Sequence, residues 1–233
     1  MKILAADTST PSGSVAVMEG DRLLAEWTFH SGHTHNRRLL KTLDSVLREL
    51  GWSLDGVEAF AVTAGPGSFT GLRIGLTTIK TLAWSTGKPY VGISSLDVLA
   101  APLAYSSHPV CAVLDAKKQQ VYAALYRGNQ RGEPLRASPY QVMGPGELPG
   151  RLTEPTILVG DGWLLYRDLF RQAMGESALE PPPAFHTLRA GFLADLAQRR
   201  LLCGEAQDPV SSVPLYVRPS EAELRLPSAS GPV

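Results

Sequence analysis

The chain has 233 residues, of which 44% are hydrophobic and 19% are charged, as expected of a globular protein that builds a substantial core. Its 22 basic and 22 acidic residues cancel, which argues against a protein whose main task is to grip nucleic acid unaided. No apolar run approaches the roughly 18 residues of a membrane span and the N-terminus lacks a signal-peptide pattern, so we expect a cytoplasmic protein.

The first half of the chain predicts a β-meander followed by alternating helices and strands. The helix after the meander is indicated by Leu39, Leu43, Val46 and Leu50, which fall on one face at helical spacing. The expected elements are strands at 3–6, 14–18 and 23–29, a helix at 36–50, a strand at 57–63, a helix at 70–86 and a strand at 90–93.

A similar order of elements begins again near residue 107. The segment ILAAD, which ends at Asp7, aligns with CAVLD, which ends at Asp115, and in both halves a turn and a second apolar strand follow. Two such units at the heads of two halves indicate a duplicated α/β fold. We expect one subdomain at 1–106, a second at 107–217 and a partly disordered tail at 218–233.

The stretch AGPGSFTGLRIG, residues 64–75, raises the main functional question. Backbone N–H groups at the start of a helix can bind a phosphate, although the Gly-Lys-Ser/Thr of a Walker-type loop is replaced here by Gly-Leu-Arg. The alternative is that Gly71 and Gly75, four residues apart on one helix face, permit close packing against a neighbouring element or a partner. The candidates for nucleotide binding in this stretch are Gly65, Gly67 and Ser68.

Asp7 ends the first predicted strand and is followed by the hydroxyl-rich turn TSTPSGS. An aspartate in this position can hold the water shell of a metal–phosphate group, as in actin-like kinases, and so joins the candidates for nucleotide binding. The alternative is an aspartate that hydrogen-bonds its own turn, which is common. The sequence leaves both interpretations open.

The segment HSGHTHN contains His30, His33 and His35, directly before the first predicted helix. A helical zinc pair needs two histidines four residues apart, and none of the intervals here is four. The two cysteines, Cys111 and Cys203, stand far apart beside apolar neighbours, as buried reduced thiols do. We therefore expect no metal site and interpret the histidine segment as a polar loop that caps the helix.

Several segments taken together resemble the TsaB (YeaZ) family, and the resemblance covers essentially the whole chain in order. They are MKILAADTS…GSVAV, HTHN, AGPGSFTGLRIGL, VGISSLDVLA, LDAKKQQVYAALY and PLYVR, of which the glycine-rich block is the most specific. The resemblance implies a duplicated actin-like (ASKHA, ribonuclease H-like) α/β fold with two subdomains, each a mixed sheet flanked by helices.

The resemblance also implies a function in making N6-threonylcarbamoyladenosine beside the anticodon of bacterial tRNA. A member of this family pairs with the transferase TsaD, the ATPase TsaE joins the pair, and tRNA is reached only through the complex. The H-x-x-x-H metal motif of TsaD-like proteins is absent here, so a non-catalytic scaffold is expected. No cofactor is firmly expected, ATP or ADP at the partner interface being the one candidate, and the chain is expected to form a homodimer in isolation.

In the family, the helices corresponding to 36–50 and 70–86 form the face that meets TsaD or a second copy. The candidate contact positions carried over from it are Leu40, Leu43, Leu47, Leu72, Arg73 and Leu76. Some of the apolar residues of each helix must instead face the chain's own core, and the sequence does not show which residues face the core and which face a partner. Two other functions stay open: an actin-fold small-molecule kinase that uses Asp7 and the glycine-rich loop, and a metallopeptidase-like protein.

Overall fold

The computed structural model describes residues 1–30 and 36–218, which form two mixed β-sheets and the helices that cover them. Residues 31–35 of the histidine segment and the tail from 219 lie outside the described residues. The first sheet contains β1 (Lys2–Asp7), β2 (Ser12–Glu19), β3 (Arg22–His30), β4 (Ala59–Gly65) and β5 (Tyr90–Ser94). The second contains β6 (Val110–Lys117), β7 (Gln120–Arg127), β8 (Leu135–Arg136), β9 (Gln141–Met143), β10 (Thr156–Val159) and β11 (Ala178–Leu179). The helices are α1 (Asn36–Glu49), α2 (Phe69–Thr86), α3 (Ser95–Ala100), α4 (Asp161–Leu165), α5 (Arg167–Met174) and α6 (Ala190–Leu202).

The first sheet has the strand order β3-β2-β1-β4-β5. Its central strand β1 runs antiparallel to β2 and parallel to β4, and side chains alternate between the two faces. Leu4 and Ala6 enter the core beneath α1 and α2, whereas Ile3 and Ala5 enter the core on the opposite face. Both faces are covered, which is why this strand is almost continuously apolar.

The second sheet repeats this plan with the order β11-β10-β6-β7-β8, and β9 also pairs with β7. Here β6 takes the place of β1, because it runs antiparallel to β7 and parallel to β10. Asp7 pairs with Ser14 across the first hairpin, and Asp115 pairs with Val121 across the second. The duplicated α/β fold predicted from the aligned segments is confirmed.

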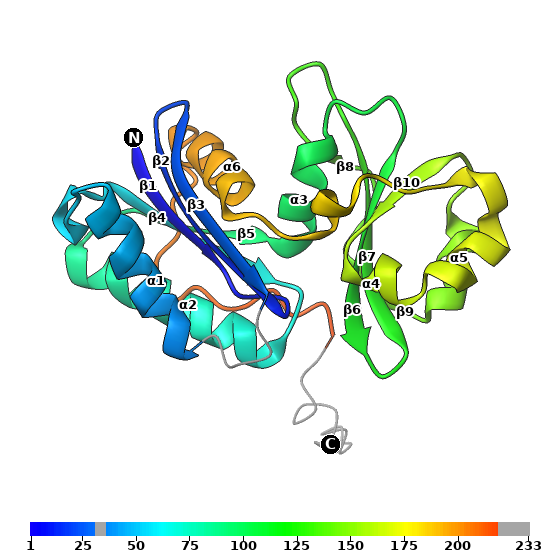
Figure 1. Ribbon diagram of the computed structural model, residues 1–233, viewed down its shortest axis with the longest axis horizontal. Helices are drawn as coiled ribbons and strands as arrows, with labels where there is room; N and C mark the ends of the chain where they lie inside the picture. The colour runs from blue at the N-terminus through cyan, green and yellow to red at the C-terminus, as the bar shows by residue number, and fades with distance from the viewer. Residues whose placement is uncertain (31–35, 219–233) are drawn as a thin grey trace, which may run out of the picture.

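The elements stack as alternating layers of helix and sheet (Figure 1). Helices α1 and α2 cover the outer face of the first sheet, and α4 and α5 cover the outer face of the second. Helices α3 and α6 fill the space between the two sheets and share one large apolar core with both of them. The two subdomains are therefore joined by a continuous core.

Helix α6 belongs structurally to the first sheet, although the sequence places it within the predicted second subdomain of residues 107–217. It has no capping side chain of its own, and the first sheet satisfies its leading N–H groups instead. Ala190 N donates to Ser14 Oγ at 3.0 Å, and Gly191 N donates to Glu26 Oε1 at 2.7 Å. Glu26 also pairs with Arg189, so a nearly buried carboxylate fixes the helix start.

The chain after α6, which we call the C-terminal segment (residues 205–218), also returns to the first subdomain. Gln207 N donates to Tyr90 O at 2.8 Å, and Gly92 N donates to Gln207 Oε1 at 3.0 Å, so the segment follows the free edge of β5. Further on, Leu215 N donates to Ala64 O at 2.7 Å, at the first residue of the glycine-rich stretch. The C-terminal segment thereby connects the edge of the first sheet to the loops between the subdomains.

Candidate functional site

The Asp7 carboxylate is fully buried at the end of β1 and holds the turn that follows it. Its Oδ1 accepts hydrogen bonds from the backbone N of Ser9 at 3.0 Å, from the Ser9 hydroxyl at 2.6 Å and from the Thr63 hydroxyl at 2.6 Å. Of the two interpretations left open by the sequence, this geometry matches the aspartate that supports its own turn.

The glycines of the stretch 64–75 allow α2 to begin directly against that turn. A Cβ on Gly71 would lie 2.0 Å from Thr8 O, and a Cβ on Gly75 would lie 2.3 Å from Thr8 Oγ1. The same hydroxyl donates to Gly71 O at 2.7 Å, which ties the β1–β2 turn to the helix. The glycines therefore serve close packing against an element of the chain itself, one of the two alternatives considered for them.

Similar packing involves the residues that precede α2. A Cβ on Gly67 would lie 2.3 Å from Ser9 O, and the Ser68 amide already donates to that carbonyl at 2.7 Å. A Cβ on Gly65 would lie 2.9 Å from the backbone oxygen of Leu215. Gly65 and Gly67 therefore pack against the protein's own backbone. Nucleotide binding at the four candidates, Asp7, Gly65, Gly67 and Ser68, stays a prediction, and we derive no nucleotide chemistry through them.

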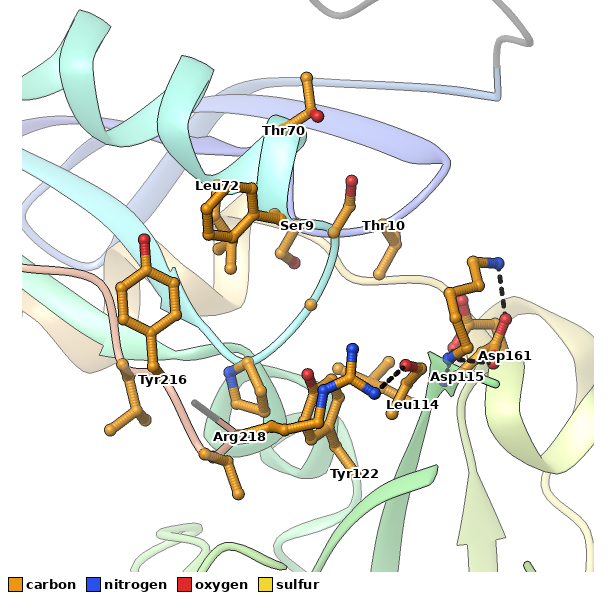
Figure 2. A pocket seen from close by; sticks show the side chains of 18 of the residues that line it. Ser9, Thr10, Thr70, Leu72, Leu114, Asp115, Tyr122, Asp161, Tyr216 and Arg218 are labelled. Atoms are coloured by element: carbon orange, nitrogen blue, oxygen red, sulfur yellow. Dashed lines mark hydrogen bonds and ion pairs between the residues drawn. The ribbon is translucent and has the colours of Figure 1, made fainter. Parts of the chain in front are cut away.

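A cleft of about 650 Å³ does lie beside the loop, between the two subdomains (Figure 2). One wall is the β1–β2 turn with Ser9 and Thr10, together with the start of α2. The facing wall is the end of β6 with the first residue of α4, Asp161, and the C-terminal segment closes the remaining side. Gly67 and Ser68 line this cleft, whereas Asp7 and Gly65 do not.

Two carboxylates and a lysine occupy the second-subdomain wall. Asp115 repeats the geometry of Asp7, because its Oδ1 accepts from the backbone N two residues later, that of Lys117, at 2.8 Å. Its Oδ2 is 2.6 Å from Lys117 Nζ, and this hydrogen bond raises the pKa of the lysine. Asp161 Oδ1 accepts from Asp115 N at 3.0 Å, and burial raises the pKa of the Asp161 carboxyl. Asp161 therefore both lines the cleft and supports the turn.

The helix faces divide the six candidate contact positions into two groups. Leu43, Leu47, Leu72 and Leu76 are buried in the core between the helices and the first sheet, so the expectation of a contact role is wrong for these four in this structure. These four leucines form the apolar face with which each helix packs on the sheet, so their side chains are not exposed to a partner. Leu40 is 57% exposed and Arg73 is exposed, with its guanidinium 3.9 Å from the ring centre of Phe69, and both stay candidates.

Two other expectations concern metals and membranes. Within the ranges 1–30 and 36–218, no three histidine, cysteine or acidic side chains gather as a metal site would require. His30 bonds Ser12 Oγ through Nδ1 at 3.0 Å, while His33 and His35 lie outside the described residues. Among the helices that the structure describes, none has the length and apolarity needed to cross a membrane.

Comparison with known proteins gives the family. A family model described as TsaD, tRNA N6-adenosine threonylcarbamoyltransferase, matches residues 30–222. The Bacillus subtilis protein named tRNA threonylcarbamoyladenosine biosynthesis protein TsaB is 31% identical over 228 residues, which is 97% of both chains. The chain belongs to the TsaB (YeaZ) family. The Escherichia coli protein of the same name is 32% identical to it over 178 residues, 74% of this chain and 77% of its own.

Solved structures agree with this assignment. YeaZ from Pseudomonas aeruginosa superimposes with a TM-score of 0.78 at 30% identity, covering 92% of this chain and 99% of its own. The fold is the duplicated actin-like one that the sequence resemblance implied, with two mixed sheets flanked by helices. The TsaB family is thus supported by sequence, fold and length together.

Sequence reasoning did not identify several residues that the structure makes prominent. Trp84 is 68% exposed on the outer face of α2, and Arg218 reaches the cleft from the C-terminal segment. Trp84 could have been found as the aromatic residue that breaks the polar face of its helix. Lys117 could have been found from the aligned aspartates, because it stands two residues after Asp115 as Ser9 stands two after Asp7.

Proposed function

We propose that this TsaB-family chain is a non-catalytic subunit required for N6-threonylcarbamoylation of the adenosine beside the anticodon in tRNA. The reaction is taken from its relatives, which are named as biosynthesis proteins for that modified nucleoside. The transferase partner is a TsaD-type subunit, and a TsaE-type ATPase completes the complex. What this chain supplies is a docking face that holds the transferase in its active arrangement.

The observation that carries the proposal is the outer face of α1 and α2. Leu40 on α1 is 57% exposed and Trp84 on α2 is 68% exposed, on helices that pack side by side over the first sheet. Exposed tryptophans are enriched at interface hot spots, where removal of water from a large ring contributes strongly to affinity. We call Leu40, Arg73 and Trp84 the docking face.

The charge of the chain fits a subunit that does not hold tRNA by itself. Its basic and acidic residues are equal in number, 22 of each, whereas proteins that bind the phosphate backbone alone carry a basic excess. We therefore assign tRNA contact to the complex. In the absence of the transferase, the same docking face pairs two copies of this chain into a homodimer. ATP or ADP at the partner interface stays a prediction.

Substitution of Leu40 tests the docking face. Leu40→Asp places a charge on the face without disturbing the core, so we expect at least about a tenfold loss of affinity for the transferase, equivalent to about 1.4 kcal/mol. The matched control is Leu135→Asp, because Leu135 is 52% exposed but lies on β8 of the second subdomain. Affinity is measured by titration calorimetry with purified TsaD.

Equal affinities of Leu40→Asp and Leu135→Asp for TsaD would show that the docking face does not bind the transferase. Steady ATP turnover by the isolated chain would contradict the non-catalytic assignment and favour the kinase alternative. Thermal unfolding of Leu40→Asp should match that of the wild type, which separates a lost contact from a damaged fold.

A further inference from the structure

The cleft between the subdomains is placed where open α/β sheets hold ligands. In such sheets the binding crevice lies beyond the carboxyl ends of the strands, at the point where the strand order changes direction. The loops after β1 and β4 reach the cleft from the first sheet, and the end of β6 and the start of α4 reach it from the second. Its volume of about 650 Å³ is within the range of small-molecule sites.

Arg218 brings a cation into this cleft from the C-terminal segment. Figure 2 shows its side chain extending past Tyr122 toward the end of β6. Nη1 donates to Gln120 Oε1 at 3.1 Å and to Ala116 O at 3.4 Å. Among the described residues both of its bonds use Nη1, so Nη2 and Nε keep donors for a ligand. A guanidinium presents these donors in a planar fork that matches an oxyanion.

The other charges around the cleft largely cancel. The cationic side chains are those of Arg73, Lys117 and Arg218, and the anionic ones are those of Asp115 and Asp161. Lys117 is committed to Asp115 at 2.6 Å, and the Asp161 carboxylate accepts from the Asp115 backbone. Arg73 is stacked on Phe69, with its guanidinium 3.9 Å from the ring centre. Arg218 is thus the cation best placed to meet a ligand, and a ligand of one negative charge would balance it.

The remaining lining is apolar and aromatic. Tyr216 and Phe69 approach with ring centres 5.8 Å apart, and Leu72 and Leu114 face the cleft from the two subdomains. Hydroxyl groups of Ser9 and Thr10 lie on the wall beside them. We propose that this cleft binds a small organic anion, with its oxyanion group on Arg218 and its apolar or aromatic body between Tyr216 and Leu114.

A phosphate monoester and a carboxylate share this chemistry, so the experiment compares both. The full ¹⁵N-labelled chain is titrated at constant ionic strength with phenyl phosphate, benzoate and inorganic phosphate while amide chemical shifts are followed. We expect saturation at about millimolar concentrations for at least one of the two aromatic anions. Inorganic phosphate, which lacks an aromatic ring, should bind at least tenfold more weakly. Tighter binding of phenyl phosphate than of benzoate identifies a phosphate ester as the natural ligand, and tighter or equal binding of benzoate identifies a carboxylic acid.

The position of the site is tested by where the shifts occur and by substitution. Saturating shifts should concentrate at residues 9–10 and 115–118, and Arg218→Gln should weaken binding at least tenfold. Arg131→Gln is the control, because Arg131 is an exposed arginine in the β7–β8 loop away from the cleft. The proposal is overturned if neither aromatic anion saturates, if the shifts centre elsewhere, or if Arg218→Gln binds as the wild type does. Shift mapping on the wild type decides the matter even where Arg218→Gln proves unstable.

Discussion

At the residue scale, the junction of the two subdomains depends on glycines, because a side chain at their positions would collide with neighbouring atoms. Gly67 just before α2, and Gly71 and Gly75 within it, have no side chain where this segment meets the β1–β2 turn. The turn itself is fixed by Asp7, whose buried carboxylate accepts three hydrogen bonds through one oxygen. Loop, turn and helix are therefore packed and hydrogen-bonded together at the junction of the subdomains.

Gly71→Ala tests this packing. The added Cβ would lie 2.0 Å from the backbone oxygen of Thr8, which cannot move without the turn. Alanine is intrinsically better than glycine in a helix by roughly 1 kcal/mol, but overpacking against backbone costs more, so we expect a net loss of about 2 kcal/mol in the free energy of unfolding. The measurement is equilibrium unfolding in urea.

Gly56→Ala is the matched control, because no heavy atom lies within 4 Å of the position of its Cβ. Its stability should stay within about 0.5 kcal/mol of the wild type. If Gly71→Ala proved as stable as Gly56→Ala, the close-packing explanation of the glycine-rich loop would be wrong.

Residues of this kind are only partly visible in the sequence. The spacing of Gly71 and Gly75 indicated a close approach, and the missing lysine excluded a Walker-type loop, but neither named the neighbour. The neighbour is the turn of residues 8–9, which is distant in sequence and is brought close by the parallel pairing of β1 with β4. In the same way, helical spacing grouped Leu40 with Leu43, and only the packing of α1 on the sheet separated them.

At the element scale, the loop after β10 repeats the arrangement of the loop after β4. Gly160 and Gly162 pack against the backbone of Val113 and Leu114 on β6, as the glycines before and within α2 pack against the β1–β2 turn. Here the loop is held by a histidine, because Gly160 N donates to His186 Nδ1 at 3.2 Å. That acceptor exists only in the neutral imidazole, and burial lowers the pKa of His186.

This contact predicts a pH dependence of stability. The folded state holds His186 neutral while the unfolded chain takes up a proton below about pH 6.5, so stability is fully present above that pH. It should fall as the pH decreases toward the lowered folded pKa, by up to about 1.4 kcal/mol per pH unit within that window. Urea unfolding of the wild type at pH 7.5 and 5.5 measures the difference.

His186→Gln removes the titrating group, so its free energy of unfolding should fall less than that of the wild type between pH 7.5 and pH 5.5. His108→Gln is the control, because His108 is exposed, and it should keep the slope of the wild type. An unchanged slope in His186→Gln would show that other groups control the acid sensitivity.

Most elements could be predicted from local pattern, but not where each one packs. The stripe of leucines and the following glycine fixed α1 within a residue or two at each end. Helix α6 was also predicted, yet its position on the first sheet depends on Glu26 and Ser14, more than 160 residues earlier in the chain. The spacing of apolar residues predicts a helix but does not show which distant segment the helix packs against. For this reason the predicted subdomain of 107–217 includes a helix that packs on the first sheet. The short strands β8 and β11 have two residues each, too few for a pattern.

At the scale of the whole molecule, the proposed docking face and the proposed ligand cleft are connected by the C-terminal segment. The docking face lies on the outer side of the first subdomain, the cleft lies between the subdomains, and Arg73 belongs to both. The C-terminal segment touches both regions, since Lys80 of α2 donates to Ser212 O and Arg218 enters the cleft. A partner seated on α2 would therefore contact the same segment that closes the cleft.

We propose that this chain enables a transferase without performing the chemistry itself. The most direct test of this proposal is reconstitution of tRNA threonylcarbamoylation from purified TsaD, TsaE, threonylcarbamoyl-adenylate and tRNA, with the wild-type chain, Leu40→Asp, Leu135→Asp or no added chain. We predict full modification with the wild type and Leu135→Asp, a strong reduction with Leu40→Asp, and almost none without the chain. Equal modification in the absence of the chain would show that the transferase does not need this subunit.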